Sequence, residues 1–313
     1  LVNEGVLIYE NTRMKDISDE NPYRVITDKG EIKAKYVIIA SHFPVYDHLA
    51  FYFARMYQSR TYALGLKIKE KFPGGMYLSA ESPSRSLRAQ PTEEGELVLL
   101  VGEEHKTGQP QETKSYYEAL KKFACENYDV ESIPYHWSTQ DCMPLDNIPY
   151  IGRIKDGVEN MFVATGFKKW GMTHSIISGL IIKDLIINRD NSWIELYNPS
   201  RFTLKQSFKK FFEVNLDVAK ELVSGKLEIP ENSLKDLKNE EGVVIDIEGR
   251  KVGAYKDNKG EVYLVDTTCS HLGCELKWND AEKSWDCPCH GSRFTYTGEV
   301  IQGPAVKNLQ RLN

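Results

Sequence analysis

"CSHLGC" at residues 269–274 and "CPCHGS" at residues 287–292 lie in the last quarter of the chain and contain four of its six cysteines. Cys269, His271, Cys287 and His290 offer the four thiolate and imidazole ligands that a tetrahedral zinc or iron needs. Zinc fingers usually pair two cysteines on one segment and two histidines on another. Here each loop offers one thiol and one imidazole. Three roles are therefore open for the two loops: a zinc site, a disulfide and a redox centre.

Residues 232–313 resemble the Rieske 2Fe-2S proteins, whose two loops read CTHLGC and CPCHGS. The resemblance implies that Cys269 and Cys287 bind the inner iron and that His271 and His290 bind the outer iron. Two imidazoles in place of two thiolates make such a cluster less negative, which raises its reduction potential from about −400 mV towards roughly −150 to +300 mV. A zinc-stabilised structural domain stays the alternative.

Five more residues take their expected roles from the same resemblance. Cys274 and Cys289 match the pair that joins the two loops in a disulfide. Ser292 matches a serine that donates a hydrogen bond to cluster sulfur and raises the potential. The respiratory proteins place a tyrosine hydroxyl where this chain has Phe294, so we expect a lower potential than theirs, and Pro304 matches a loop that covers the cluster.

The segment before these loops has the pattern of a small all-β unit. Short alternating runs fill residues 241–266, with turn residues at Glu248–Gly249 and at 258–260. Residues 191–231 are mixed and contain a helical stretch, which predicts a linker with a helix. The Rieske domain is therefore expected to cover 232–313.

The first part of the chain predicts an α/β fold. Residues 5–12, 22–30 and 31–41 are strand candidates, and "YVIIAS" at 36–41 is typical of a buried parallel strand. Residues 160–187 repeat the order of buried strand, glycine-containing loop and helix. Ligands of such sheets bind beyond the carboxyl ends of the strands.

The region between these parts has a different character. Residues 45–135 contain long strand candidates and a helix near 114–128, which predicts an antiparallel substrate-side domain inserted into the first domain. The expected domains are 1–44 with 136–190, then 45–135, the linker 191–231, and 232–313.

Residues 36–41 and 144–186 resemble the second half of the D-amino acid oxidase and glycine oxidase (DAO) superfamily. The residues on which this resemblance rests include Gly152 in "PYIG" and Thr165 and Gly166 in "FVATG". The resemblance implies FAD, an α/β FAD-binding fragment and an antiparallel-sheet substrate domain before the all-β Rieske domain. The flavin contacts that it implies are Ala40, Ser41, Gly166, Phe167, Trp170, Gly171, Met172 and Thr173. A helix that begins near Thr173 would aim N–H groups at the flavin; alternatively, the glycines only form a tight turn.

The chain lacks the GxGxxG spacing that cradles the FAD pyrophosphate. We therefore expect an N-terminally truncated fragment of a protein that binds FAD at full length. No catalytic residue can be assigned from the sequence. Arg85, Arg88, His105 and Lys106 are the candidates for contact with a substrate, and an arginine would suit a carboxylate, although solvated loop charges explain them equally well.

Charge and hydropathy narrow the remaining classes. The 313 residues carry a net charge of −5 without a dense basic run, so we expect no nucleic-acid partner. The most apolar stretch, 175–187, is too short to span a bilayer, and a cytoplasmic location is expected. The sequence thus predicts an FAD-dependent oxidoreductase with a small-molecule substrate and an unknown redox partner; the alternative is a Rieske electron carrier on a flavin-free scaffold.

Overall fold

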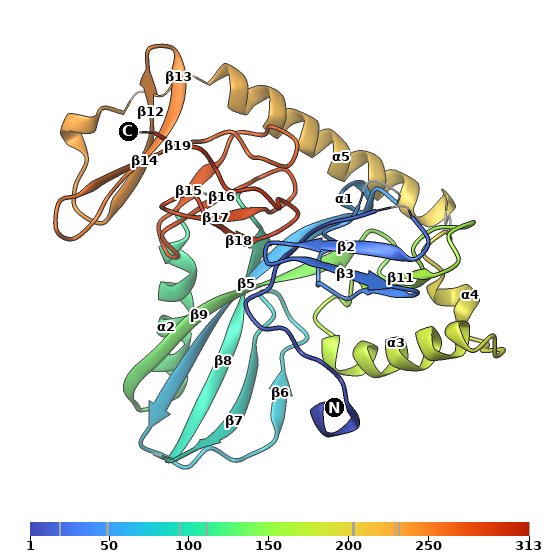
Figure 1. Ribbon diagram of the computed structural model, residues 1–313. Coiled ribbons are helices and arrows are strands. Elements are labelled where there is room, and N and C mark those ends of the chain that lie inside the picture. The colour runs from blue at the N-terminus through green and yellow to red at the C-terminus, as the bar shows by residue number, and fades with distance from the viewer. Residues whose placement is uncertain are drawn as a thin grey trace. The chain divides into compact units, whose positions relative to one another are not determined.

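The computed structural model describes residues 1–18, 20–47, 50–93, 95–110, 112–201, 204–228, 230 and 232–312. In helix α5 the side chains are described from residue 209 on. These residues form two compact units. Figure 1 shows the helices and strands, coloured by residue number. The first unit consists of residues 1–56 and 144–210, and the second of residues 57–143 and 211–313.

The first unit contains two small sheets. Strands β1 (Met14–Ile17), β2 (Tyr23–Thr27) and β3 (Glu31–Ala34) form an antiparallel sheet in that order. The second sheet has the order β10 (Tyr150–Arg153), β11 (Met161–Thr165), β4 (Val37–Ile39), and β11 pairs with β4 in parallel. The parallel pairing of β4 is the one expected for the apolar run at residues 36–41.

Helix α3 (Gly171–Ile186) packs on the second sheet of this unit (Figure 1). Its buried residues Ile181, Ile182 and Leu185 share a core with Ile151 of β10 and Phe162 of β11. Two one-turn helices, α1 (Tyr52–Arg55) and α4 (Ile194–Tyr197), and a 3₁₀ turn at Val2–Glu4 complete the unit. The order of strand, glycine loop and helix therefore follows the prediction for residues 160–187.

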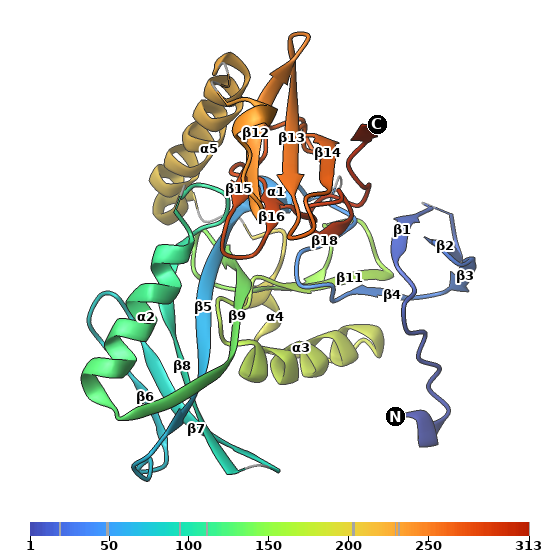
Figure 2. The ribbon, with the colours of Figure 1, turned by 90° about the vertical axis from the view of Figure 1, so that its left-hand side faces the viewer.

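The second unit contains a five-stranded sheet in the order β6-β7-β8-β5-β9. The strands are β6 (Met76–Leu78), β7 (Ser86–Thr92), β8 (Gly95–Lys106), β5 (Met56–Ile68) and β9 (Val130–Pro144). Helix α2 (Lys114–Asn127) lies beside this sheet (Figure 2). It has apolar residues at helical spacing, and its Leu120 and Ala124 pack on Leu64 and Leu100 of the sheet. We call this sheet the substrate-side sheet.

The same unit contains helix α5 (Leu204–Leu227) from residue 211 on and two four-stranded sheets. One has the order β12 (Glu241–Ile247), β13 (Arg250–Lys256), β14 (Val262–Asp266), β19 (Arg311–Leu312). The other has the order β15 (Lys277–Asn279), β16 (Ser284–Asp286), β17 (Arg293–Thr295), β18 (Val300–Gln302), and a 3₁₀ turn lies at Leu234–Asp236. The predicted fold class, α/β followed by an all-β Rieske-like region, is confirmed.

Two tryptophans, Trp278 and Trp285, connect the two sheets of the all-β region by packing. A Cβ at Gly253 would lie 2.7 Å from the ring of Trp285, and one at Gly242 would lie 2.3 Å from the ring of Trp278. The rings pack on each other with centroids 4.8 Å apart. Both tryptophans are therefore packing residues, because the chain leaves the space above two glycines for them.

Two details differ from the sequence-based expectations. Residues 5–12 are not a strand; the strand that pairs with β2 begins at Met14, and the earlier apolar side chains are exposed. Ile38 of β4 is 49% exposed, so the run at residues 36–41 is not buried on both faces as expected. Cys142 is buried and lies 3.3 Å from Gln58 Oε1.

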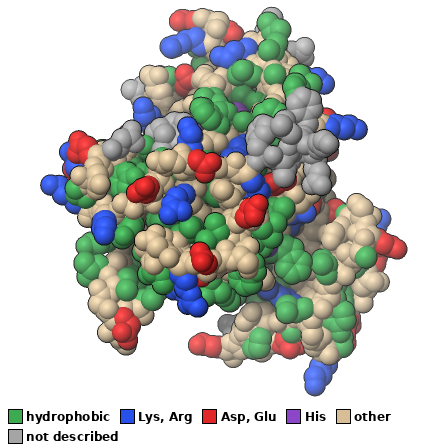
Figure 3. All heavy atoms as spheres, turned by 90° about the vertical axis from the view of Figure 1, so that its right-hand side faces the viewer, with side chains coloured by type: hydrophobic (Ala, Val, Ile, Leu, Met, Phe, Trp, Pro, Cys, Tyr) green, Lys and Arg blue, Asp and Glu red, His purple; other side chains and the backbone are tan. Residues whose placement is uncertain are grey.

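The surface carries charges of both signs. On the face that Figure 3 shows, Lys and Arg side chains are interspersed with Asp and Glu. Within the described parts of the chain, no helix is both long and apolar enough to cross a membrane.

Candidate functional site

The two cysteine-histidine loops have the same backbone pattern. Cys269 N–H donates to Cys274 O at 2.8 Å, and Gly273 N–H donates to Cys269 O at 2.9 Å. In the second loop Cys287 N–H donates to Ser292 O at 2.8 Å, and the N–H of the glycine four residues on donates to Cys287 O at 2.9 Å. Both glycines have positive φ, 75° and 73°, a conformation that suits glycine. The pattern folds each hexapeptide back on itself.

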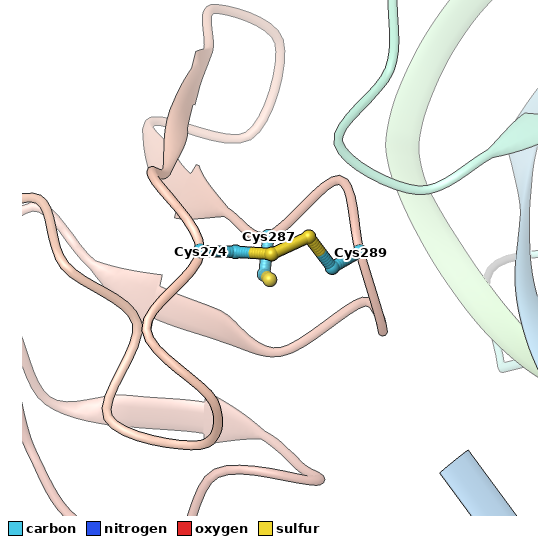
Figure 4. A group of neighbouring side chains, drawn as sticks. All are labelled: Cys274, Cys287 and Cys289. Carbon is cyan, nitrogen blue, oxygen red and sulfur yellow. A yellow bond between two sulfur atoms is a disulfide. The ribbon is translucent and has the colours of Figure 1, made fainter. Parts of the chain in front are cut away.

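A disulfide joins the two loops. Cys274 and Cys289 are bonded, with Cα atoms 6.5 Å apart, within the usual range. Figure 4 shows the Cys287 sulfur beside this bond, and the three sulfurs lie within 4.8 Å of one another. Because two of these sulfurs form the disulfide, this trio is not itself a metal site, and Cys287 is the one thiol it leaves for a ligand.

The thiols of Cys269 and Cys287 face each other in the buried core. They are 2% and 1% exposed. A hydrogen bond with Cys287, supported by the Ser292 hydroxyl, lowers the pKa of Cys269 to about 7, whereas the hydrogen bond with Cys269 and burial raise the pKa of Cys287. The pair thus holds one thiolate readily, and a metal cation would favour the second.

The two histidines supply neutral imidazoles. The rings of His271 and His290 are perpendicular, at 89°, with centroids 5.1 Å apart. Burial lowers the pKa of His271 to about 4 and that of His290 to about 3. Two thiol and two neutral imidazole donors, one of each from each loop, fit a 2Fe-2S cluster of the Rieske type.

The neighbours of the cluster loops are also buried. Ser292 Oγ hydrogen-bonds to Cys269 and accepts from the backbone N–H of Ala305. Phe294 is fully buried among the apolar residues of this core. Pro304 is buried beside them, and its peptide bond with Gly303 is cis. Phe294 offers no hydroxyl at the position where the respiratory proteins have one.

The expected flavin contacts lie in the first unit, at one edge of its parallel strands. Val163 pairs with Ile39, so the chain leaves β4 at Ala40 and Ser41 and leaves β11 at Gly166 on the same edge. Phe167 follows, and α3 begins at Gly171 with no side-chain cap. The helix start at Trp170, Gly171, Met172 and Thr173 is exposed.

Gly166 has a packing reason of its own. Its φ is 73°, and a Cβ there would lie 2.6 Å from Cγ of Pro144 and 3.2 Å from the sulfur of Met56. At Gly171 a Cβ would meet nothing closer than 4.0 Å. Gly171 therefore leaves room for an approaching group, whereas Gly166 makes the turn.

The four substrate candidates lie on strands β7 and β8 or next to them. Three of them already have a side-chain partner within the protein. Arg85 Nε donates to Glu103 at 2.9 Å, His105 Nε2 lies 2.9 Å from the Tyr62 hydroxyl, and Lys106 forms an ion pair with Asp217 of α5. Arg88 is exposed, and its guanidinium has no ion pair among the described residues.

The residues that sequence analysis missed are those that contact the second cluster loop. Gln140 Nε2 donates to Gly291 O at 2.8 Å, from 151 residues away in the chain. Thr107 Oγ1 in turn donates to Gln140 Oε1 at 2.9 Å. No motif marks these positions, because glutamine and threonine in strands carry no signal of their own.

Comparison with known proteins gives the family. Residues 1–185 match the FAD dependent oxidoreductase family (DAO), and residues 229–313 match the Rieske [2Fe-2S] domain. YhfW of Bacillus subtilis (strain 168), described as a Rieske 2Fe-2S iron-sulfur protein, is 46% identical over 314 residues, covering 100% of this chain and 62% of YhfW. The chain thus spans less than two thirds of that relative.

Two further comparisons concern one part of the chain each. Glycine oxidase from Geobacillus kaustophilus has a similar fold, with a TM-score of 0.53 and 16% identity over 64% of this chain and 55% of the oxidase. The cytochrome b6-f complex iron-sulfur subunit 1 of Nostoc sp. (strain PCC 7120) is 51% identical over 47 residues, 15% of this chain and 26% of that subunit.

The two matches give the two cofactors, FAD for the first part and a 2Fe-2S cluster for the second, as predicted. The roles of individual ligand and flavin residues stay predictions. Since the DAO match extends over more than half of the chain, the chain belongs to the FAD-dependent oxidoreductases of the DAO family and combines that family's fold with a Rieske [2Fe-2S] domain.

Proposed function

We propose that the whole protein oxidises a small organic molecule that bears an amine or hydroxyl group and passes the electrons singly through its Rieske cluster. The carrying observation is that a flavin-oxidase part and a cluster domain share one chain. In addition, the cluster domain and the substrate-side sheet form one compact unit. A flavin oxidase that used oxygen alone would have no need of such a domain.

The two cofactors supply complementary chemistry. When bound, FAD would take a hydride, that is two electrons and one proton, from a substrate C–H bond, and a 2Fe-2S cluster would take up and give away one electron at a time. The substrate loses two electrons and two protons in total. An outside acceptor, the unknown redox partner, receives the two electrons one after the other.

The residues of the two loops would hold the cluster. Cys269 and Cys287 would bind one iron as thiolates, and His271 and His290 would bind the other. Neutral imidazoles make the cluster less negative, so it accepts electrons from a moderate donor. The Ser292 hydroxyl, which already hydrogen-bonds to Cys269, would stabilise charge on that sulfur in the reduced state.

On the flavin side the chain would orient the ring and favour negative charge on it. The backbone N–H groups at the start of α3, from Gly171 to Thr173, lack a side-chain cap and could donate to an electron-rich ring. Gly171 leaves room beside them. Ala40, Ser41, Phe167 and Trp170 would line the same strand edge.

The substrate and the location are part of the proposal. Arg88 is the candidate that the structure leaves exposed, and its guanidinium would suit a substrate carboxylate. In the reducing cytoplasm that we propose as the location, the disulfide Cys274–Cys289 has to resist reduction by thiols. Both cysteines are buried, which limits attack by a thiolate.

The test uses the full-length protein under anaerobic conditions. A panel of amino acids, secondary amines and 2-hydroxy acids is added, and flavin absorbance and the electron paramagnetic resonance (EPR) spectrum are followed. We expect one class to bleach the flavin and then to produce the rhombic signal of a reduced Rieske cluster. A protein that keeps its cluster but never retains flavin would be an electron carrier instead. A colourless protein after reconstitution with iron and sulfide would be a zinc domain.

A further inference from the structure

The two cluster loops differ in their surroundings. In the first loop Ser270 and Leu272 are exposed, Leu272 by 51%. In the second loop every residue from Cys287 to Ser292 is buried. Because the backbone patterns of the two loops are the same, the difference arises from what covers the second one.

The cover is the substrate-side sheet with the turn after β8. Four of its residues surround the second loop, and we call them the socket: Gln58 of β5, Thr107 and Gly108 after β8, and Gln140 of β9. The socket and the loop belong to the same compact unit.

Gln140 fixes the loop through its backbone. Its side chain is 3% exposed, and its Nε2 donates to Gly291 O at 2.8 Å. Thr107 Oγ1 donates to the other end of the same amide, which sets the orientation of the Gln140 side chain. Gly291 directly follows His290, and its N–H donates to Cys287 O. Gln140 thus links the sheet to Gly291, whose own N–H closes the second loop between the expected ligands Cys287 and His290.

Two glycines bring the backbones together. A Cβ at Gly108 would lie 2.6 Å from the carbonyl carbon of Cys287 and from Pro288 N. A Cβ at Gly291 would lie 2.5 Å from Cβ of Gln58. Since real Cβ atoms do not approach so closely, loop and socket fit only with glycine at both positions.

Polar contacts around the socket hold the cluster domain in the same place. The Thr113 hydroxyl donates to Asn279 Oδ1 at 2.7 Å, and the Tyr117 hydroxyl donates to Glu282 Oε1 at 2.7 Å. Lys106, next to the socket, pairs with Asp217 of α5. Together with the socket, these contacts form an extended interface.

We propose that the substrate-side sheet is part of the cluster site: the socket positions Cys287 and His290, and Gln140 is its main positioning residue. The cluster site of this chain is then built by two domains and not by the Rieske fold alone. The inference rests on the Rieske match and goes beyond the proposed reaction, since it needs neither flavin nor substrate.

The test compares Gln140→Met with Gln90→Met. Both replace a glutamine of the same sheet, but Gln90 lies exposed on β7, and its side chain donates to O of the adjacent Pro91. In the iron-free protein we expect Gln140→Met to speed amide hydrogen exchange of residues 287–292 about fivefold, the value of one hydrogen bond near 1 kcal/mol. Residues 269–274 should exchange as before. In the loaded protein the EPR g-values and midpoint potential should shift, and Gln90→Met should leave all readouts unchanged.

Thr107 supplies a graded check. Thr107→Val removes the hydroxyl that orients Gln140 and should loosen the second loop in the same direction, about twofold to fivefold. Thr107→Ser keeps the hydroxyl and should restore the original exchange rate and EPR spectrum. The proposal is overturned if Gln140→Met matches Gln90→Met in exchange and spectrum, or if both cluster loops loosen equally, as a general loss of stability would cause.

Discussion

Ser292 Oγ accepts a hydrogen bond from the backbone N–H of Ala305 at 3.0 Å, which ties the second cluster loop to the segment that contains Pro304. The same hydroxyl hydrogen-bonds to Cys269 in the first loop. One side chain therefore joins three segments around the buried thiols. The hydroxyl therefore acts as a hydrogen-bond donor to the Cys269 sulfur and as an acceptor from the N–H of Ala305.

Ser292→Ala should lower the cluster's reduction potential. The reduced cluster carries more negative charge on its sulfurs, and the lost donor stabilises that state by about 1 kcal/mol, which corresponds to about 40 mV for one electron. Protein-film voltammetry gives the potential. Ser284→Ala, a buried serine that bonds to Asp286, is the control. An unchanged potential in Ser292→Ala would mean that the hydroxyl only supports the loop.

Phe294→Tyr should raise the potential by a similar amount, about 40 mV. Phe294 is fully buried in the core of the cluster loops, and the resemblance to the respiratory proteins places a tyrosine hydroxyl within reach of a cysteine sulfur there. The added oxygen has to fit a packed core, so thermal unfolding is measured alongside. A folded variant with the original potential would contradict this account of the tuning.

The disulfide should contribute strongly to the stability of the iron-free protein. Cys274 and Cys289 are 15 residues apart, and closing a loop of that length is worth about 3 kcal/mol. We expect the double variant Cys274→Ser with Cys289→Ser to lose about that free energy of unfolding in urea titration. Cys125→Ser, at an exposed thiol, should change it by less than about 0.5 kcal/mol.

The Rieske domain could be predicted from the sequence because the expected ligands are close along the chain. "CSHLGC" and "CPCHGS" each carry their ligands within four residues, and the turn glycines fix the backbone. The parallel pairing of β4 could also be predicted, since a continuous apolar run is typical of parallel strands. The predicted burial on both faces was wrong, because Ile38 of this strand is 49% exposed.

The socket could not be predicted in this way. Gln140 reaches Gly291 across 151 residues, and Lys106 pairs with Asp217 across 111. Such pairs follow from how domains pack, and neither residue type marks its partner. For the same reason the sequence suggests Lys106 as a substrate contact, whereas in the structure Lys106 forms an ion pair between the sheet and α5.

His105 should make stability fall on acidification. Burial lowers the pKa of His105, which donates or accepts at the Tyr62 hydroxyl and stacks on Tyr116. Its folded pKa lies below the unfolded value of about 6.5. The unfolded state therefore binds more protons, and stability that is present above about pH 6.5 is lost as the pH falls towards the folded pKa.

His105→Gln should flatten that slope. Urea titrations of the iron-free protein at pH 7, 6 and 5 give the free energy of unfolding at each pH. His136→Gln is the matched control, because His136 lies exposed on β9. Equal slopes in the two variants would show that another group causes the acid sensitivity.

The exposed first loop should be the side from which an outside acceptor takes electrons. Leu272 is 51% exposed next to His271, whereas the second loop is covered by the socket. In Leu272→Glu a negative charge next to the cluster should slow re-oxidation by ferricyanide, an anion, about threefold at low ionic strength. The effect should fade as salt is added, because screening shortens the range of the charge.

The matched control is Ile301→Glu, which adds the same charge at an exposed apolar residue of β18 outside the two cluster loops. Stopped-flow absorbance of the dithionite-reduced cluster gives the rate for both variants. Re-oxidation that slows equally in the two would point to net charge alone. A slower rate only in Leu272→Glu would make the first loop the electron exit, because the anion then senses the charge at that loop and not the charge of the protein as a whole.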